Sequence, residues 1–97
     1  MALYITLARY SQKGIENIKD STKRADAAKK LFGSLGGKMT AFYLTLGHYD
    51  FVFVSEFPND EAAAKALLAI GSQGNIHTQT LRAFSEDEYR KLIGSLP

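Results

Sequence analysis

The chain has 97 residues, of which 45% are hydrophobic and 23% charged, a composition typical of one soluble globular domain spanning residues 1–97. The net charge is only +2, and cysteine is absent, which excludes disulfides, thiolate metal ligands and cysteine nucleophiles. A domain of this size buries only about 60 to 65% of its unfolded surface, so association with further copies is favoured.

The first predicted element is a strand over residues 2–9, where apolar side chains alternate. Leu3, Ile5 and Leu7 lie on one side of this strand, and Tyr4 is on the other. The segment has no basic leader, and no apolar run of 18 residues occurs anywhere in the chain. These features predict a cytoplasmic protein that does not bind membranes.

Helical spacing follows, from Ser11 as the capping residue to the paired glycines at 36–37. Residues 20–22, Asp-Ser-Thr, compete for backbone hydrogen bonds and predict a break within this helix. Most of the positive charge lies here, on Lys19, Lys23, Arg24, Lys29 and Lys30. Acidic residues are interspersed and stacking aromatics are few, so a solvated helix face is favoured over a nucleic-acid site.

A hairpin is predicted next, with strands over residues 38–46 and 51–54 joined by a turn at 47–49. In the second of these strands Phe51 and Phe53 compete with Val52 and Val54 for the core, so its faces cannot be assigned. A strand that is apolar on both sides indicates that something covers the second side.

Two helices and one strand complete the pattern. Asn59 is a plausible cap for a helix over residues 62–70, and residues 75–84 alternate as a fourth strand. Ser85 and Glu88 have the spacing of a capping box ahead of a short C-terminal helix.

The order of elements predicts an α+β domain of the ferredoxin-like, split β-α-β-β-α-β type, with a four-stranded antiparallel sheet. The two main helices would cover one sheet face. The residues expected on that face are Leu3, Ile5, Leu7, Phe42, Leu44, Leu46 and Leu81. The residues expected on the uncovered face are Tyr4, Thr6, Tyr43, Thr45, Thr78, Thr80 and Arg82. A second copy of the chain is the cover expected for that face, giving a homodimer or higher oligomer.

Residues 45–50, Thr-Leu-Gly-His-Tyr-Asp, resemble the hairpin of the GYD domain family. Residues 14–20, 34–38 and 74–84 also resemble that family, so the likeness covers nearly the whole chain. The resemblance implies a dimeric α+β barrel, in which two four-stranded sheets enclose a cavity. A similar hairpin occurs in the ligand-binding domains of feast/famine transcription regulators, which bind small effectors at subunit contacts, but this chain lacks their DNA-binding helices.

The hairpin and the histidines have structural interpretations beside functional ones. Gly47 is expected to have a positive φ and Asp50 to accept hydrogen bonds from turn amides, so turn stabilisation is favoured over ligand binding. Tyr49 is a candidate to lie over the barrel mouth. His48 and His77 are the only histidines and lack the spacing of a metal site.

Arg82 is the cation expected on the uncovered face, where a buried guanidinium needs an anionic or carbonyl partner. Glu56 is one candidate partner. A salt bridge, within the chain or between subunits, is favoured, and an anionic small ligand is the alternative.

No nucleotide-binding, nucleophile-elbow or zinc-protease motif is present, and no cofactor or metal is expected. The leading hypothesis is a homo-oligomeric small-molecule-binding module, with the ligand in or at the mouth of the intersubunit barrel. Its ligand-binding candidates are Tyr4, Thr6, Tyr43, Thr45, His48, Tyr49, Asp50, Thr78, Thr80 and Arg82. The alternatives are a small cofactor-independent enzyme of oxygenase or isomerase type, using Tyr4, His48 or Arg82, and a purely structural interaction module.

Overall fold

Four antiparallel strands form one sheet in the order β2-β3-β1-β4 in the computed structural model, which describes residues 1–97. The strands are β1 (Ala2–Tyr10), β2 (Lys38–Leu44), β3 (Phe51–Phe57) and β4 (Ile76–Ala83). Together with the helices between them they form a ferredoxin-like α+β fold, which confirms the predicted fold class.

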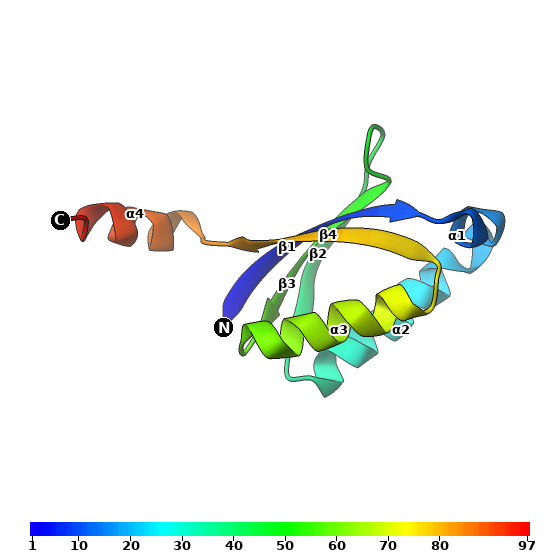
Figure 1. Cartoon of the computed structure of the whole chain (residues 1–97), viewed down its shortest axis with the longest axis horizontal. Coiled ribbons are helices and arrows are strands. Elements are labelled where there is room, and N and C mark those ends of the chain that lie inside the picture. The colour runs from blue at the N-terminus through cyan, green and yellow to red at the C-terminus, as the bar shows by residue number, and fades with distance from the viewer.

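Helices cover one face of this sheet (Figure 1). The helical segments of the chain are α1 (Gln12–Glu16), the 3₁₀ turn η1 (Ile18–Asp20), α2 (Ser21–Ser34), α3 (Asp60–Ser72) and α4 (Glu86–Gly94). The predicted break near Asp20 is confirmed, because η1 separates α1 from α2. Helices α2 and α3 lie on the same side of the sheet, whereas α4 projects away from the rest of the chain. None of the helices combines the length and the apolar character needed to cross a membrane.

The predicted helix caps are confirmed. The Ser11 side chain accepts a hydrogen bond from the amide three residues on, at 3.1 Å, and the Asn59 side chain does the same at 2.9 Å. At the start of α4 the Ser85 hydroxyl accepts from the Glu88 amide at 3.2 Å, and the Glu88 carboxylate accepts from the Ser85 amide at 2.9 Å. These bonds to Ser85 hold the pKa of Glu88 below its ordinary value.

The core is built around phenylalanines. Phe32 of α2 is fully buried, and its ring centroid lies 5.8 Å from that of Phe53 and 5.1 Å from that of Phe57, both on β3. Ala63 and Ala66 of α3 are also buried, and their small side chains let this helix approach the sheet closely. Strand β3 therefore supplies most of the bulk between the sheet and the helices.

The side-chain directions predicted for β1 and β4 are wrong. Thr6 lies opposite Phe53 of β3 and Thr80 of β4, and directly paired residues point to the same face of a sheet. Since Phe53 packs against α2, the helix-covered face includes Tyr4, Thr6, Thr78, Thr80 and Arg82. The opposite face, which we call the open face, is lined at its centre by Leu3, Ile5, Leu7, Ala41, Tyr43, Val52, Val54 and Leu81.

The error has a physical cause. Strand β1 is apolar on both sides, and the more aliphatic side was expected to face the helices. Instead the rings of β3 fill the space beneath the helices, and β1 contributes the smaller Thr6 and Ala8 there, both fully buried. The hydroxyl of Thr6 is satisfied by the Thr80 hydroxyl at 2.9 Å, so its burial leaves no unpaired polar group.

Strand β2 follows the prediction more closely, with Phe42 and Leu44 on the helix side and Tyr43 on the open face. Its register shifts between Met39 and Ala41, which makes Thr40 the extra residue of a β-bulge. The strand ends at Leu44 and not at residue 46. Leu46, predicted to face the helices, is fully exposed in the loop that follows.

Candidate functional site

Asp50 fastens the β2–β3 loop to the end of β1. Its carboxylate accepts a hydrogen bond from the Tyr10 amide at 2.8 Å, and its own amide donates to the Ala8 carbonyl at 2.8 Å. Within the loop, Thr45 donates from its hydroxyl to the Tyr49 carbonyl at 2.6 Å and from its amide to the Asp50 carbonyl at 2.9 Å. These contacts give Asp50 and Thr45 structural roles. The Asp50 carboxylate accepts a hydrogen bond from the amide of a strand residue, whereas a donor within the turn was expected.

The remaining residues of this loop lie on the side of the sheet away from α2 and α3 (Figure 1). Gly47 has the expected positive φ, 157°. The Tyr49 hydroxyl donates to the Gln79 side chain of β4 at 2.8 Å, so the loop reaches across β1. Exposed His48 packs edge-on against the Tyr49 ring at 4.9 Å. No group of three His, Cys, Asp or Glu side chains is close enough to hold a metal ion.

Tyr4 and Arg82 form a second polar group, on the helix-covered face. The Tyr4 hydroxyl donates to the Asp60 carboxylate at the start of α3. Burial, the hydrogen bond to Asp60 and the charge of Asp60 raise the pKa of Tyr4, and the nearby Arg82 charge opposes them. The Arg82 guanidinium lies 5.6 Å from the Tyr4 ring and 4.6 Å from the Phe84 ring, a cation–π arrangement.

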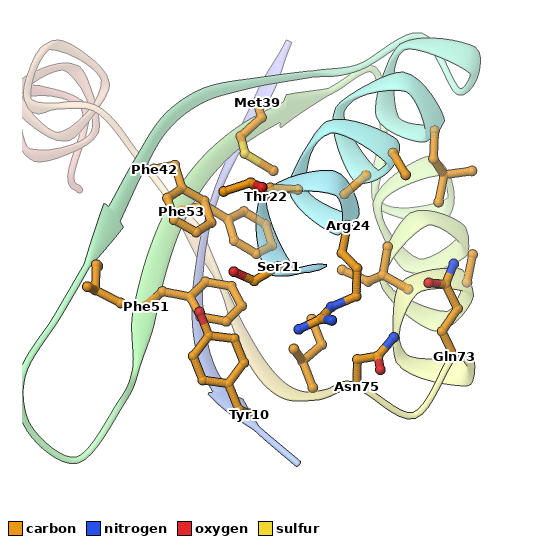
Figure 2. A pocket seen from close by; sticks show the side chains of 18 residues that line it. Tyr10, Ser21, Thr22, Arg24, Met39, Phe42, Phe51, Phe53, Gln73 and Asn75 are labelled. Atoms are coloured by element: carbon orange, nitrogen blue, oxygen red, sulfur yellow. The ribbon is translucent and has the colours of Figure 1, made fainter. Parts of the chain in front are cut away.

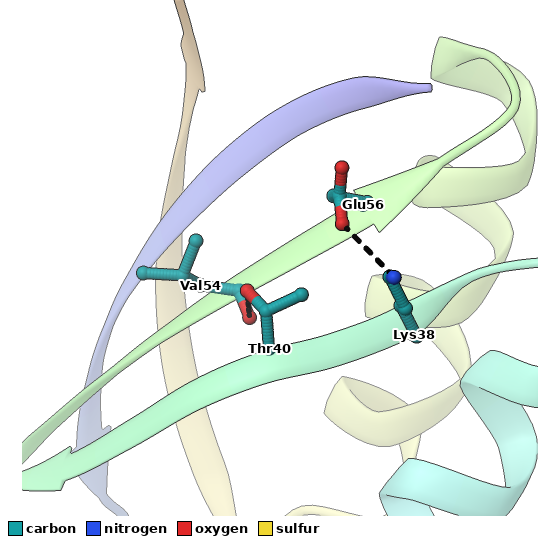
Figure 3. A network of polar contacts seen from close by, with 4 residues as sticks. All are labelled: Lys38, Thr40, Val54 and Glu56. Atoms are coloured by element: carbon teal, nitrogen blue, oxygen red, sulfur yellow. Dashed lines mark hydrogen bonds and ion pairs between the residues drawn. The ribbon is translucent and has the colours of Figure 1, made fainter. Parts of the chain in front are cut away.

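Within the chain, Arg82 does not pair with Glu56, the candidate partner suggested by the sequence. It donates to the backbone carbonyls of Leu3, at 3.3 Å, and of Ala83. Glu56 instead pairs with Lys38 across β2 and β3 at 3.6 Å, on the open face (Figure 3). In the same figure Thr40 donates to the Val54 carbonyl at 3.3 Å and closes the β-bulge. The predicted need of the Arg82 guanidinium for an anionic or carbonyl partner is thus met by backbone carbonyl oxygens, and two aromatic rings lie against it.

Within one chain, the predicted ligand-binding residues do not come together in one place. Tyr4, Thr6, Thr78, Thr80 and Arg82 are on the helix-covered face, whereas Tyr43 is on the open face and is 62% exposed. The loop residues 45–50 lie at the end of β1 occupied by Ala8 and Tyr10, and Tyr4 pairs with Arg82 toward the other end. His48 is therefore not placed with the other two residues of the enzymatic alternative.

Two features stand out as places where another molecule can bind. The first is the open face, where aliphatic residues of three strands adjoin without a helix above them. The second is a cavity of about 470 Å³ between the helix-covered face of the sheet, α2 and the end of α3 (Figure 2). The cavity was missed from the sequence, although small residues on α2 opposite aromatic residues on β2 and β3 are a usable signal for such a gap.

Comparisons with known proteins agree with this fold. The family model for the GYD domain matches residues 4–93. A curated relative from Thermus thermophilus, named glutamine synthetase and cystathionine beta-lyase binding protein, is 32% identical over 84 residues, covering 86% of this chain and 88% of the relative.

Solved structures resemble the chain at lower sequence identity. A crystal structure of a Thermus thermophilus protein is 22% identical with a TM-score of 0.56, covering 88% of this chain and 95% of the other. The structure of FFRP-DM1 is 15% identical with a TM-score of 0.62, covering 87% of this chain and all of the other. These two similarities concern the fold, whereas the family match and the curated relative extend over most of the chain, and the protein is therefore a member of the GYD domain family.

Proposed function

We propose that this GYD domain is a homo-oligomeric binding module whose copies join through their open faces. The observation that carries the proposal is the aliphatic centre of that face, formed by Leu3, Ile5 and Leu7 of β1 beside Val52 and Val54 of β3. An antiparallel sheet with one solvated face normally alternates apolar and polar residues along each strand. Here β1 and the first half of β3 are apolar on both sides, as expected for strands covered on both faces.

The energetics favour a cover over this face. Full burial of one leucine, isoleucine or valine side chain contributes about 1.5 to 3 kcal/mol, and a second copy would bury the same residues on each partner. Charged and polar residues lie toward the ends of the strands, where Lys38 pairs with Glu56 and Arg9 lies opposite His77. An apolar centre with a polar rim is the usual organisation of a protein interface.

Helix α4 supplies a second unpartnered surface. Phe84, Tyr89, Leu92 and Ile93 are each about half exposed, between 49% and 57%, and the helix extends beyond its own sheet. Its position lets it reach a neighbouring copy more readily than its own core. We infer that α4 extends the contact between copies.

The binding function itself is proposed from the relative and from the loop. The relative is named as a binding protein for two enzymes, and we propose that this chain likewise binds a metabolic enzyme. Of the predicted ligand-binding residues, Tyr43, His48 and Tyr49 are the ones that lie beside the open face. We propose that they would contact a small ligand at the mouth between two copies. Glutamine synthetase is the first protein partner to test.

The assembly is tested by light scattering after size exclusion, on the wild-type chain and two variants. Ile5→Lys places a charge at the centre of the open face, and Leu68→Lys places the same charge on α3 at a leucine that is 75% exposed. We expect a dimer or larger species for the wild type and for Leu68→Lys, and a folded monomer for Ile5→Lys. A monomeric wild type, or an oligomer unaffected by Ile5→Lys, would remove the proposal.

The partner is tested by surface binding of glutamine synthetase from the same source organism to the immobilised chain. Saturable binding supports an enzyme-binding role. Absence of binding by a chain that is shown to be oligomeric would refute the partner while leaving the assembly intact.

A further inference from the structure

We propose that the cavity between the sheet and α2 binds a small amphipathic carboxylate, with its apolar body among phenylalanine rings and its carboxylate on Arg24. The cavity lies on the helix-covered side of the sheet. It is therefore separate from the open face, and the two proposals stand or fall independently.

The cavity has the size and lining of a small-molecule site. Its volume of about 470 Å³ falls within the range of about 300 to 1,000 Å³ common for such sites. Phe42 and Phe51 stack at 5.2 Å along one wall, with Phe53 beside them, and Ala25 and Ala28 of α2 lie opposite. Because these alanines are small, the lining leaves a gap beside the three aromatic rings that the protein's own side chains do not fill. Figure 2 shows Phe42, Phe51 and Phe53 at this space.

Arg24 gives the cavity its polarity. It is the only charged residue among the 18 that line the space. Figure 2 shows its side chain at the cavity, on the same side as Asn75. Its two terminal nitrogens donate to the carbonyls of Asn17, at 2.9 Å, and Gly14, at 3.2 Å. A guanidinium has five N–H donors, so these two bonds leave donors for another acceptor.

No carboxylate of the chain neutralises Arg24. The three ion pairs of the protein involve Lys38, Lys65 and Arg90, and no Asp or Glu lines the cavity. A half-buried cation beside an apolar space favours a ligand with one negative charge at one end. Ser21 and Asn75 also line the cavity and can add neutral hydrogen bonds to the same carboxylate.

The binding test uses isothermal titration of the full chain with decanoate and with decan-1-ol, which share the apolar chain and differ in charge. Decanoate is expected to bind roughly tenfold more tightly than the alcohol, as one charge-assisted contact predicts. Absence of decanoate binding, or equal binding of the two compounds, would overturn the proposal.

Two variants separate the parts of the site. Arg24→Gln should lower decanoate affinity about tenfold and leave the alcohol unchanged. Ala28→Phe should fill the cavity and weaken both compounds while Arg24 keeps its bonds. Decanoate binding unchanged in Ala28→Phe, or a preference for the carboxylate that persists in Arg24→Gln, contradicts the assignment.

Location and competing occupants are decided by amide chemical shifts and one further variant. Decanoate should shift the amides of Ala25 and Asn75 and leave those of Ile5 and Val54 in place, whereas the reverse pattern assigns binding to the open face and refutes this site. If Leu92→Glu in α4 both raises decanoate affinity and reduces the oligomer size, α4 of a second copy is the native occupant and the small-ligand proposal fails.

Discussion

The Asp50 carboxylate and the Tyr10 amide are joined by a hydrogen bond of 2.8 Å that connects the β2–β3 loop to the end of β1. This bond continues the pairing of β1 with β3 beyond the last regular pair, and the Asp50 amide adds a second bond to Ala8. The aspartate of the hairpin therefore acts as an acceptor that closes the central strand pair.

Asp50→Ala should destabilise the domain by about 1 to 3 kcal/mol, because the half-buried Tyr10 amide loses its acceptor. Asp50→Asn retains an oxygen acceptor and should lose less. Urea unfolding curves measure both effects, with Asp26→Ala on the exposed side of α2 as the control. An Asp50→Ala variant as stable as the Asp26→Ala control would show that this bond contributes nothing.

Gly14 and Gly33 are a matched pair of helical glycines with opposite expected responses to alanine. A Cβ on Gly14 would lie 2.0 Å from the Asn75 carbonyl oxygen, a backbone atom, so Gly14→Ala should cost about 2 kcal/mol or more. Nothing lies within 4 Å of a Cβ on Gly33, and Gly33→Ala should stabilise α2 by about 0.5 to 1 kcal/mol. Thermal unfolding of the two variants tests this, and equal shifts of the same sign would contradict the packing at Gly14.

Tyr4→Phe removes the hydrogen bond to Asp60 and should cost about 1 kcal/mol at neutral pH. Because the pKa of Tyr4 is raised in the folded chain, its contribution is complete below the ordinary tyrosine pKa of about 10 and is lost as pH rises through the folded pKa. The stability difference between wild type and Tyr4→Phe should thus be constant up to about pH 9 and shrink above it. Urea titrations at several pH values measure it, and a difference that grows with pH would reverse the assigned sign.

The double change Leu92→Glu with Ile93→Glu should weaken association by at least tenfold, because α4 would lose two side chains of its apolar stripe. The midpoint of thermal unfolding of the monomer should change little, since α4 packs on no helix of its own chain. Sedimentation velocity measures the association, with Lys91→Glu as the control on the same helix. If the double variant and the control associate alike, α4 has no part in the contact.

The element order and the helix caps were predictable because they depend on local chemistry. Asn59, Ser85 and Glu88 carry the side chains that caps require, and Gly47 has the positive φ expected in the hairpin. Periodicity could not predict which side of β1 faces the helices. Leu3, Ile5 and Leu7 are at least as apolar as the β1 side chains that the helices cover. The buried phenylalanine rings of β3 fill the space beneath the helices, and this packing decides which side of β1 lies there. Such packing joins residues that are far apart in the sequence.

The candidate site was less predictable than the fold. For Arg82 a salt bridge was favoured over the other expected partners, but backbone carbonyls and the rings of Tyr4 and Phe84 surround it. Arg24 was grouped with the solvated lysines of its helix. Residue spacing alone does not show that its guanidinium turns toward the carbonyl oxygens of Gly14, in α1, and Asn17, just after α1. Both cases depend on contacts between segments that are distant in sequence or separated by a helix break.

Contacts between copies can be observed directly by mixing chains that carry ¹³C-labelled isoleucine methyl groups with unlabelled chains and recording isotope-filtered NOEs. The Ile5 methyl should show NOEs to the unlabelled partner, while the Ile70 methyl, buried between α3 and the sheet, should show none. Intermolecular NOEs confined to methyls on the helix side, or none at all at concentrations well above any measured dissociation constant, would contradict association through the open face.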